Sequence, residues 1–451
     1  MKTFALTTLA LLLAACSSVP LKPPHALPDP APWKATPADA AAAAATATAT
    51  PDAWALWADP ALRSLQAQAV ARNRDVSQAL LRVQKAQLAW QASQQDQEPR
   101  PSLSLQTSAS RPLEAGSLSR SMGLSAGLSY EADLWGRLSA ATQAQAAQLE
   151  AQHTDVLAAQ GLIRSQVAER VWTLAALAQE APLIEAQRQG AAEILALTRL
   201  RVQEGKLLPI EVDKAAIALQ ALQVRQVQQG RDRLLQQLSL ETLLDDSSLV
   251  LPASPQLPSA TLPALALGSP AEVLSRRPDV QRARWGVDVA LAQQRVAQAA
   301  RYPQLSFSLG VSTGGSEWRD WLDKPLANLA ANLVVPLVDW RRLKLQQAQA
   351  HTDVEAAALS LRDTLHKAQV EIEQVAAERQ ALAAEAQAQA ARLAEAQRTE
   401  RLAQLRFEVG SIAKLDWLQA RNARLAAEQE AVQMRLRQAL NQANLIKVLA
   451  L

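Results

Sequence analysis

One long helix dominates the predicted structure. Residues 137–203 read RLSAATQAQAAQLEAQHTDVLAAQGLIRSQVAERVWTLAALAQEAPLIEAQRQGAAEILALTRLRVQ, with Pro182 as the only proline. Larger apolar residues recur mostly three, four or seven positions apart, as on a packed helix face: Leu149, Val156, Ile163, Val167, Val171, Leu174, Leu177 and Ile184. At 1.5 Å per residue this helix spans roughly 100 Å, so we expect an elongated coiled coil rather than a globular core.

Two shorter helices flank the long one. The sequence predicts one from Pro60 to Gln95, and another that follows a turn at Gly205–Pro209 and runs to Leu244. Each has about 36 residues and spans about 54 Å, so the two stacked end to end match the long helix. We expect one through-going helix packed against two half-length helices.

Two short strands lie between the first helix and the long helix. Ser102–Ser110 and Met122–Tyr130 alternate apolar residues with polar or small ones, which is typical of strands with two different faces. The loop Leu113–Ser119, which contains Gly116, closes them into a predicted β-hairpin.

The same arrangement occurs twice. Marker segments recur at an offset of roughly 202 to 205 residues, and most contain Trp, Pro or Gly, which alanine-rich helices do not supply freely. They pair 74–76 with 278–280, 101–105 with 303–307, 135–138 with 340–343, and 201–205 with 406–410. The second copy is predicted to hold a helix Pro270–Arg301, strands Gln304–Ser312 and Leu326–Val338, a helix Arg341–Glu408, a turn at Gly410 and a helix to Leu445.

These spacings divide the body into two repeats. Repeat 1 covers residues 53–245, with a β-hairpin at 102–132 and a coiled coil at 136–244. A Pro-rich linker at 246–268 leads to repeat 2, residues 269–447, with a β-hairpin at 303–338 and a coiled coil at 341–445.

The amino terminus has the features of an export signal. Residues 1–15 hold a positive start and an apolar run of about ten residues, which is too short to span a bilayer. The run ends in Leu-Ala-Ala-Cys at 13–16, which resembles the lipobox of bacterial lipoproteins. That resemblance implies covalent diacylglycerol and N-acyl lipid on Cys16, the only cysteine, and Ser17 after it implies sorting to the outer membrane. An unlipidated signal peptide is the alternative.

Residues 16–52 lie between this signal and the body. They are Pro-rich and then rich in Ala and Thr, so we interpret them as an extended tether between the lipid and the coiled coils. A disordered segment with no role beyond reach remains the alternative.

Composition narrows the classes of function. The 451 residues carry 46 Lys+Arg and 43 Asp+Glu, so the net charge of +3 lacks the basic excess of a nucleic-acid binder. A single Cys excludes an internal disulfide framework, and four scattered His show no metal-ligand spacing. No dinucleotide-binding, phosphate-loop, zinc-protease or nucleophile-elbow motif occurs. We expect no enzyme and no cofactor beyond the lipid, although the paired carboxylates Glu131 and Asp133 leave an acid–base enzyme as a rival.

The four predicted strands cannot close a membrane pore within one chain. A spanning strand needs roughly 9 to 11 residues, and open strand edges are not tolerated in hydrocarbon. Three copies would supply 12 strands, enough for a barrel with a lumen. Trp318 and Trp321, with Asp320 and Lys324, fit an outward loop with aromatic residues at the membrane interface. A soluble sheet packed on the coil is the alternative.

Several short sequence motifs in this chain resemble those of one protein family. They are WADP at 57–60, LSYEADLWGR at 128–137, AEVLSRRPDV at 271–280, RYP at 301–303 and VPLVDW at 335–340, together with the two glycine turns. In these segments, and from Trp54 to Leu445 as a whole, the chain resembles the TolC-like outer-membrane efflux proteins, in particular the lipoprotein branch called the NodT or OprM type.

This resemblance implies a mainly α protein whose homotrimer forms a 12-stranded membrane β-barrel and an α-helical tunnel across the periplasm. Such a trimer is the outer-membrane channel of a tripartite efflux system. It takes small molecules such as drugs from a periplasmic membrane-fusion adaptor and an inner-membrane pump of the resistance-nodulation-division type. A non-conducting coiled-coil scaffold lipoprotein of the envelope is the alternative, and the sequence does not identify the cargo.

The resemblance also implies a gate at the tip of the coils. Asp416 matches a carboxylate that rings the pore, where three copies would attract cations. Glu211 is its counterpart after the first turn, and Lys414 and Asp213 are candidates for charge links that hold the tip shut. Gln419 occupies the second ring position and is neutral, which departs from the family pattern. Acidic residues are also favoured at any helix N-terminus, so ordinary helix capping remains open.

The residues before the two turns resemble the tip motif that meets adaptor hairpins. The motif comprises Arg201, Val202 and Gly205 in repeat 1 and Arg406, Phe407 and Gly410 in repeat 2. A C-capping glycine after a basic last turn explains the same residues, so the two readings stay open. Elsewhere we expect packing roles for Trp135 and Pro336, where strands meet coil, and a helix-entry role for Arg276, Arg277 and Asp279.

Overall fold

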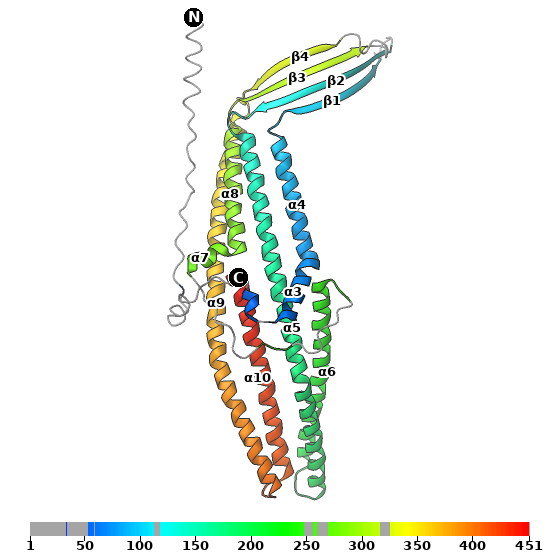
Figure 1. Cartoon of the computed structure of the whole chain (residues 1–451), viewed down its shortest axis with the longest axis vertical. Coiled ribbons are helices and arrows are strands. Elements are labelled where there is room, and N and C mark those ends of the chain that lie inside the picture. The colour runs from blue at the N-terminus through cyan, green and yellow to red at the C-terminus, as the bar shows by residue number, and fades with distance from the viewer. Residues whose placement is uncertain are drawn as a thin grey trace.

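A four-stranded antiparallel sheet lies at one end of a long bundle of helices, and the turns between the longest helices lie at the other end (Figure 1). The computed structural model describes residues 33, 53–57, 59–111, 118–247, 256–258, 269–315 and 325–450. Several predicted features lie outside these ranges. They are the signal peptide, Cys16, most of the tether and linker, the core of the loop Leu113–Ser119, and the cluster Trp318, Asp320, Trp321 and Lys324.

Two long helices run through the whole helical body. They are α5 (Arg137–Gln203, 67 residues) and α9 (Trp340–Glu408, 69 residues), and α5 has the bounds that its sequence predicted. Each packs against two shorter helices: α4 (Arg74–Gln95) and α6 (Ile210–Leu244) on α5, and α8 (Pro278–Ala299) and α10 (Lys414–Leu449) on α9. The predicted match of one long helix with two half-length helices is confirmed in both repeats (Figure 1).

The two repeats pack side by side through α5. It contacts α8 and α10 of the second repeat as well as its own partners α4 and α6. The second repeat therefore completes the environment of the first, so the body is one continuous unit.

The first short helix of each repeat is interrupted, which the sequence interpretation missed. Residues 60–95 form α3 (Pro60–Arg72) and α4, separated by Asn73 in an extended conformation. The Asn73 side chain accepts hydrogen bonds from the N–H groups of Asp75 and Val76, and donates to the Leu243 carbonyl at 3.0 Å. This side chain therefore starts a new helix and fastens it to the end of α6.

The matching break in repeat 2 has a different local cause. Residues 270–301 form α7 (Pro270–Arg276) and α8, separated by Arg277 at φ −64°, ψ 129°. Pro278 follows it, and a proline disfavours the helical conformation in the residue before it.

A 3₁₀ helix, η1 (Ala53–Trp57), precedes α3, and α10 continues to Leu449 instead of the predicted Leu445.

The sheet joins one hairpin from each repeat. Its strands are β1 (Arg100–Ser110), β2 (Ser119–Ala132), β3 (Gln304–Gly315) and β4 (Leu326–Val334), in the order β1-β2-β3-β4. β4 ends four residues before the predicted Val338, because Pro336 has no N–H to donate to the ladder. β2 and β3 form the junction between the repeats, where Leu128 pairs with Leu309.

The hydrophobic core lies around the middle of the body. One cluster joins η1, α3, α5, α6 and α10 around Trp172, which is fully buried and lies 4.7 Å from Trp57 between ring centroids. A second cluster joins α7, α8, α9 and α10 around Ile372. Both large clusters use residues remote from the sheet and from the tip turns, so the two ends of the molecule carry the exposed surfaces.

Candidate functional site

The sheet has two faces of opposite character. Strand pairing places Ser104 beside Ser125 and Ser125 beside Ser312, while the next residues along the strands, Leu105 and Leu124, pair on the other face. The polar face contains Ser102, Ser104, Gln106, Ser108, Ser121, Gly123, Ser125, Gly127, Ser129, Ser306, Ser308, Gly310, Ser312, Gly314, Asn328 and Asn332. The apolar face contains Leu103, Leu105, Met122, Leu124, Leu128, Tyr130, Leu305, Phe307, Leu309, Val311, Leu329 and Leu333.

The apolar face is uncovered. Leu103 is 75% exposed and Leu329 is 79% exposed, although both belong to regular strands. A contiguous apolar surface of this kind is rarely left in water, and it marks contact with lipid or with another protein. The polar face opposite it is suited to water.

Both edges of the sheet are also unpaired within the described chain. β1 and β4 are the outer strands of the order β1-β2-β3-β4. Unpaired edge strands present rows of N–H and C=O groups that another chain can pair with. The chain therefore holds an incomplete sheet rather than a finished domain.

Side chains fasten the sheet to the coils. The Trp135 indole donates to the Pro303 carbonyl at 2.8 Å and its ring stacks on Tyr302 at 4.8 Å between centroids. At the start of α9, the Trp340 ring has its centre 4.3 Å from the guanidinium of Arg301, which lies between α8 and β3. The Trp135 contacts cross between the repeats, and the Arg301 contact joins the segment before β3 to α9, so together they fix the direction in which the sheet leaves the coils. They agree with the packing role expected for Trp135.

The carboxylates Glu131 and Asp133, which left an enzyme as a rival interpretation, have structural partners. Glu131 accepts a two-pronged hydrogen bond from Arg137 at 2.8 Å. Asp133 accepts the N–H groups of Leu138 and Ser139 at the start of α5. Burial alone would raise the pKa of Asp133, but these backbone donors outweigh it and hold the pKa below its ordinary value. At the junction, Glu131 is therefore held by Arg137, and Asp133 caps the first turn of α5.

The two tip turns are built in the same way. Gly205 has φ +70° and Gly410 has φ +76°, a left-handed conformation that favours glycine. The N–H group that follows each glycine bonds back to the carbonyl of Arg201 or Arg406, at 2.8 Å in both repeats. This is the Schellman end of a helix, so the capping interpretation of both glycines is supported by geometry.

The remaining docking candidates lie on the last turn before each loop. Val202 and Phe407 are half-buried, and the Phe407 ring stacks on Trp417 of α10 at 5.5 Å with an interplanar angle of 4°. The Arg406 side chain is exposed and that of Arg201 is partly exposed. The structure thus brings the predicted docking residues together at one end of the body. Arg201, Gly205, Arg406 and Gly410 lie around the two loops, and Val202 and Phe407 are the half-buried members of the set.

The predicted gate residues also lie at this end, but their ion pairs differ in kind. Glu211 pairs with Lys214 on its own helix at 2.8 Å, and Asp213 is exposed. Asp416 is exposed, and its side chain accepts the Ala413 N–H at 3.2 Å to cap α10.

Lys414 is the gate candidate that reaches the other repeat. It pairs at 3.0 Å with Glu193 of α5, a residue that sequence reasoning missed because its partner depends on helix register. Close by, the side-chain hydrogen bond from Lys206 lowers the pKa of Glu204 in the first turn.

Two other kinds of feature are missing from the part of the chain that the structure describes. None of the described helices combines the length and hydropathy needed to cross a membrane. Within the described residues, no group of three or more His, Cys, Asp and Glu side chains is placed to hold a metal ion.

Comparisons with known proteins point in one direction. Residues 65–245 and 270–451 match the family described as "Outer membrane efflux protein". The chain is 28% identical to the pyoverdine export outer membrane protein OpmQ of Pseudomonas aeruginosa, over 97% of this chain and 94% of the relative. It is 27% identical to the outer membrane protein OprJ of the same organism, over 92% and 88%.

Solved structures share the fold. The open state of the MtrE outer membrane channel of Neisseria gonorrhoeae superposes with a TM-score of 0.79 at 22% identity, covering 87% of this chain and 89% of the other. Because the family match covers most of the chain in two blocks that each contain one repeat, this protein belongs to the outer membrane efflux protein family.

Proposed function

We propose that three copies of this chain form the outer-membrane channel of a tripartite efflux system. The observation that carries the proposal is the sheet: an open-edged, two-faced sheet at the end of a body about 100 Å long. Pairing β1 of one copy with β4 of the next removes every edge and gives a 12-stranded barrel. Its apolar face then meets lipid and its polar face lines the lumen.

The lumen of that barrel is uncharged over most of its height. Its face is mostly Ser, Gly, Asn and Gln, with Leu326, Ala330 and Val334 from β4, and it has Arg100 and Glu131 only near the coil end of the sheet. Short side chains leave a wide passage, and no ring of charge in this part would exclude either sign. Such a conduit suits small molecules of varied charge, including drugs, and leaves the choice of cargo to the pump.

The coils extend the passage through the periplasm and close it at the tip. Asp416, Glu211, Asp213 and Lys414 form the gate in this proposal, and their common position at the tip supports it. The tip residues Arg201, Val202, Gly205, Arg406, Phe407 and Gly410 receive a periplasmic membrane-fusion adaptor, which links the channel to an inner-membrane pump of the resistance-nodulation-division type. Lipid on Cys16 anchors the amino terminus in the outer membrane.

Current through planar bilayers tests the conduit. Purified trimer is expected to give discrete current steps, and its mass in detergent should be that of three chains. A stable monomer, or a well-folded trimer that gives no steps, would instead support a scaffold lipoprotein without a pore. The same preparation can be tested for binding to an adaptor encoded beside its gene.

A further inference from the structure

The seam between α5 and α10 changes character along its length. Toward the middle of the body it is apolar, and Ala176 of α5 shares a buried cluster with Leu436 and Ala439 of α10. Burial of such residues away from water holds the two helices together. This part of the seam is firmly closed.

Toward the tip, buried polar contacts interrupt the apolar packing of the same two helices, which still bury Ile184 of α5 and Leu425 of α10. The Gln433 amide donates to the Glu180 carboxyl, and the Gln429 amide donates to Gln187 at 3.0 Å. Farther down, a Cβ at Gly190 would lie 2.6 Å from Asn422 Oδ1, so the two helices approach closely there. Polar groups exchange these bonds for bonds to water when a seam opens, so these polar contacts oppose opening less than buried apolar side chains do.

Two buried acceptors in the polar seam lack a partner within the described chain. Gln429 is 2% exposed and its Oε1 atom receives no hydrogen bond, and neither does Asn422 Oδ1. An unsatisfied buried acceptor destabilises the state that buries it. Entry of water would satisfy both, so these groups favour a hydrated, parted seam.

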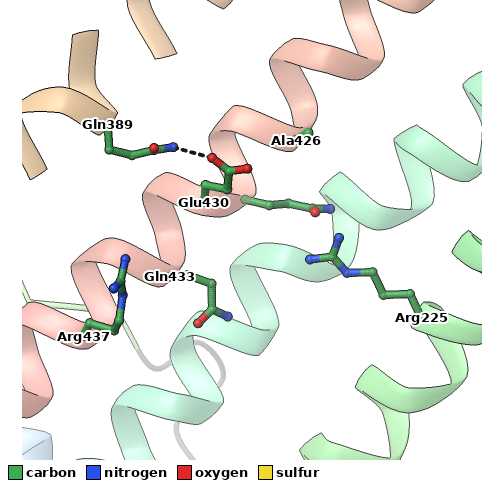
Figure 2. Close-up of a pocket in the computed structure, with 7 residues that line it drawn as sticks. Arg225, Gln389, Ala426, Glu430, Gln433 and Arg437 are labelled. Carbon is green, nitrogen blue, oxygen red and sulfur yellow. Dashed lines mark hydrogen bonds between the residues drawn. The ribbon is translucent and has the colours of Figure 1, made fainter. Parts of the chain in front are cut away.

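A cavity gives water access to this place. It has a volume of about 330 Å³ and is lined by Arg225 of α6, Gln389 of α9 and, on α10, Ala426, Gln429, Glu430, Gln433 and Arg437. Figure 2 shows the labelled side chains of the three helices around it, with Gln389 hydrogen-bonded to Glu430. Gln433 lines this cavity and also donates to Glu180, so one side chain connects the cavity wall with that carboxyl.

Pro182 places a weak point in α5 at the same level. A proline within a helix removes one backbone hydrogen bond, here to the Ala178 carbonyl, and is a common cause of bending. The Gln229 amide of α6 donates to the neighbouring Leu177 carbonyl at 2.6 Å, so α6 stays attached to α5 there. The α5–α6 pair can therefore bend as a unit below Pro182.

Glu180 is the titratable group buried at this point. It is 4% exposed, and burial raises the pKa of its carboxyl, against the opposing effects of the Gln433 hydrogen bond and the Arg225 charge. A raised pKa means that the closed seam binds the proton more tightly than a hydrated seam does. Closure is therefore favoured at pH values below the raised pKa, and this preference is lost as the pH rises through it.

The other charged groups around the cavity are already paired. Arg437 pairs with Glu385 of α9 at 3.1 Å, and Glu430 pairs with Arg392 of α9. Arg225 is the cation of α6 that acts on Glu180. These pairings leave Glu180 as the buried carboxyl whose charge must be accommodated when the seam is closed.

We propose that Glu180 is a proton-sensitive latch on the α5–α10 seam: protonation keeps the seam closed, and ionisation lets the two coils part below Pro182. The latch rests on the proposed function, because parting of the coils would widen the tip of the channel. The Glu180 latch is distinct from the gate residues at the tip, since it lies between the helices α5 and α10.

Distance measurement on spin-labelled full-length trimer tests the latch without using current. Nitroxide labels at Gln203 of α5 and Gln404 of α9 are exposed and lie near the tip on different coils. Between about pH 4 and pH 8, a range that extends upward from the ordinary Glu pKa of about 4.3, acidification should shift the distance distribution toward shorter values. Glu180→Gln, which mimics the protonated acid, should hold the short distances at every pH.

Two variants separate the latch from a merely structural effect. Arg225→Gln removes the cation that favours ionisation, so the midpoint of the transition should move to higher pH. Glu185→Gln is the control: its carboxyl has a pKa lowered to about 2 by Arg188 and stays ionised throughout, so this variant should titrate like the unmodified protein.

The outcomes distinguish the latch from the channel. A distance distribution that ignores pH, or a Glu180→Gln variant that still titrates, would overturn the latch even if current steps are normal. Distances that titrate as expected in a protein that passes no current would keep the latch and refute the conduit.

Discussion

Lys414 of α10 lies 3.0 Å from Glu193 of α5 and joins the two repeats close to their tip turns. Both side chains are almost half exposed, at 44% and 46%. An exposed ion pair of this kind contributes only about 0.2–1 kcal/mol and weakens as salt is added. It is therefore strong enough to bias a closed tip and weak enough to be broken by a docking partner.

Lys414→Ala is expected to raise single-channel conductance or the fraction of time open, because it removes this link between the coils. High salt should then have less effect on the variant than on the unmodified protein. Lys206→Ala is the matched control, since Lys206 pairs with Glu204 inside one turn and joins no coils. Equal effects of the two substitutions in planar-bilayer recordings would refute a specific role for Lys414.

Asp416→Ala is expected to raise conductance and lower the preference for cations, because three carboxylates leave the constriction. The same substitution also removes the cap on the Ala413 N–H, at a cost of about 0.5–2 kcal/mol. Asp416→Asn separates the two effects, since it keeps an acceptor and loses the charge. Reversal potentials in a salt gradient measure the preference, and unchanged values in both variants would remove Asp416 from the gate.

Gly205→Ala and Gly410→Ala are each expected to lower stability by about 1 kcal/mol, because both positions have positive φ. Gly230 is the control, since it lies within α6 with no atom within 4 Å of an added Cβ. Gly230→Ala should raise stability by about 0.5–1 kcal/mol through helix propensity. Melting temperatures of purified trimer check the opposite signs, and a loss for all three would argue against strain as the cause.

Arg277→Leu is expected to lower stability by about 1–3 kcal/mol. Arg277 is 7% exposed, pairs with Asp279 and Glu371, and donates to the Val448 carbonyl at 3.1 Å. We expect a cost below the roughly 3–5 kcal/mol usual for broken buried pairs, because both carboxylates are partly exposed and can be hydrated. The neighbouring Arg276→Leu, which breaks only an exposed pair, should cost far less.

The same cluster predicts a pH dependence. Burial opposes ionisation of Asp279, but the hydrogen bonds and charge of Arg277 outweigh it and lower the pKa. A lowered pKa stabilises the fold above the ordinary carboxyl pKa, and that contribution is lost as the pH falls through the lowered value. Arg277→Leu should therefore flatten the fall in melting temperature on acidification, whereas a parallel fall in both proteins would contradict this origin.

Cys16→Ser is expected to leave trimers forming and to weaken anchoring to the membrane, because the lipid acts through the tether rather than through the barrel. The mass in detergent measures trimer formation, membrane fractionation measures anchoring, and labelling with radioactive palmitate checks lipid attachment. Failure of the variant to assemble at all would show that the lipid does more than anchor the chain.

Much of the fold could be predicted from local patterns in the sequence. The bounds of α5 follow from an uninterrupted helical pattern between Gly136 and Gly205, and each of these glycines adopts positive φ at an end of the helix. The alternation in β1 and β2 predicted the two faces of the hairpin, because side chains in a strand point to opposite sides in turn. The break before Pro278 and the early end of β4 before Pro336 also had local signals, which the helical and alternating patterns outweighed.

The break at Asn73 shows what lay beyond local patterns. Asn73 starts a helix by capping Asp75 and Val76, but it is held by the Leu243 carbonyl, a contact 170 residues away. The register of α5 against α10 likewise decides that Lys414 meets Glu193 and that Glu180 is buried beside Gln433. The sequence by itself determined the periodic features: two repeats, long helices, a two-faced hairpin and the glycine turns, because each depends on neighbours along the chain. Only the tertiary structure decided the partners of the charged and polar groups, because two packed helices can slide by a turn without changing the pattern of either one.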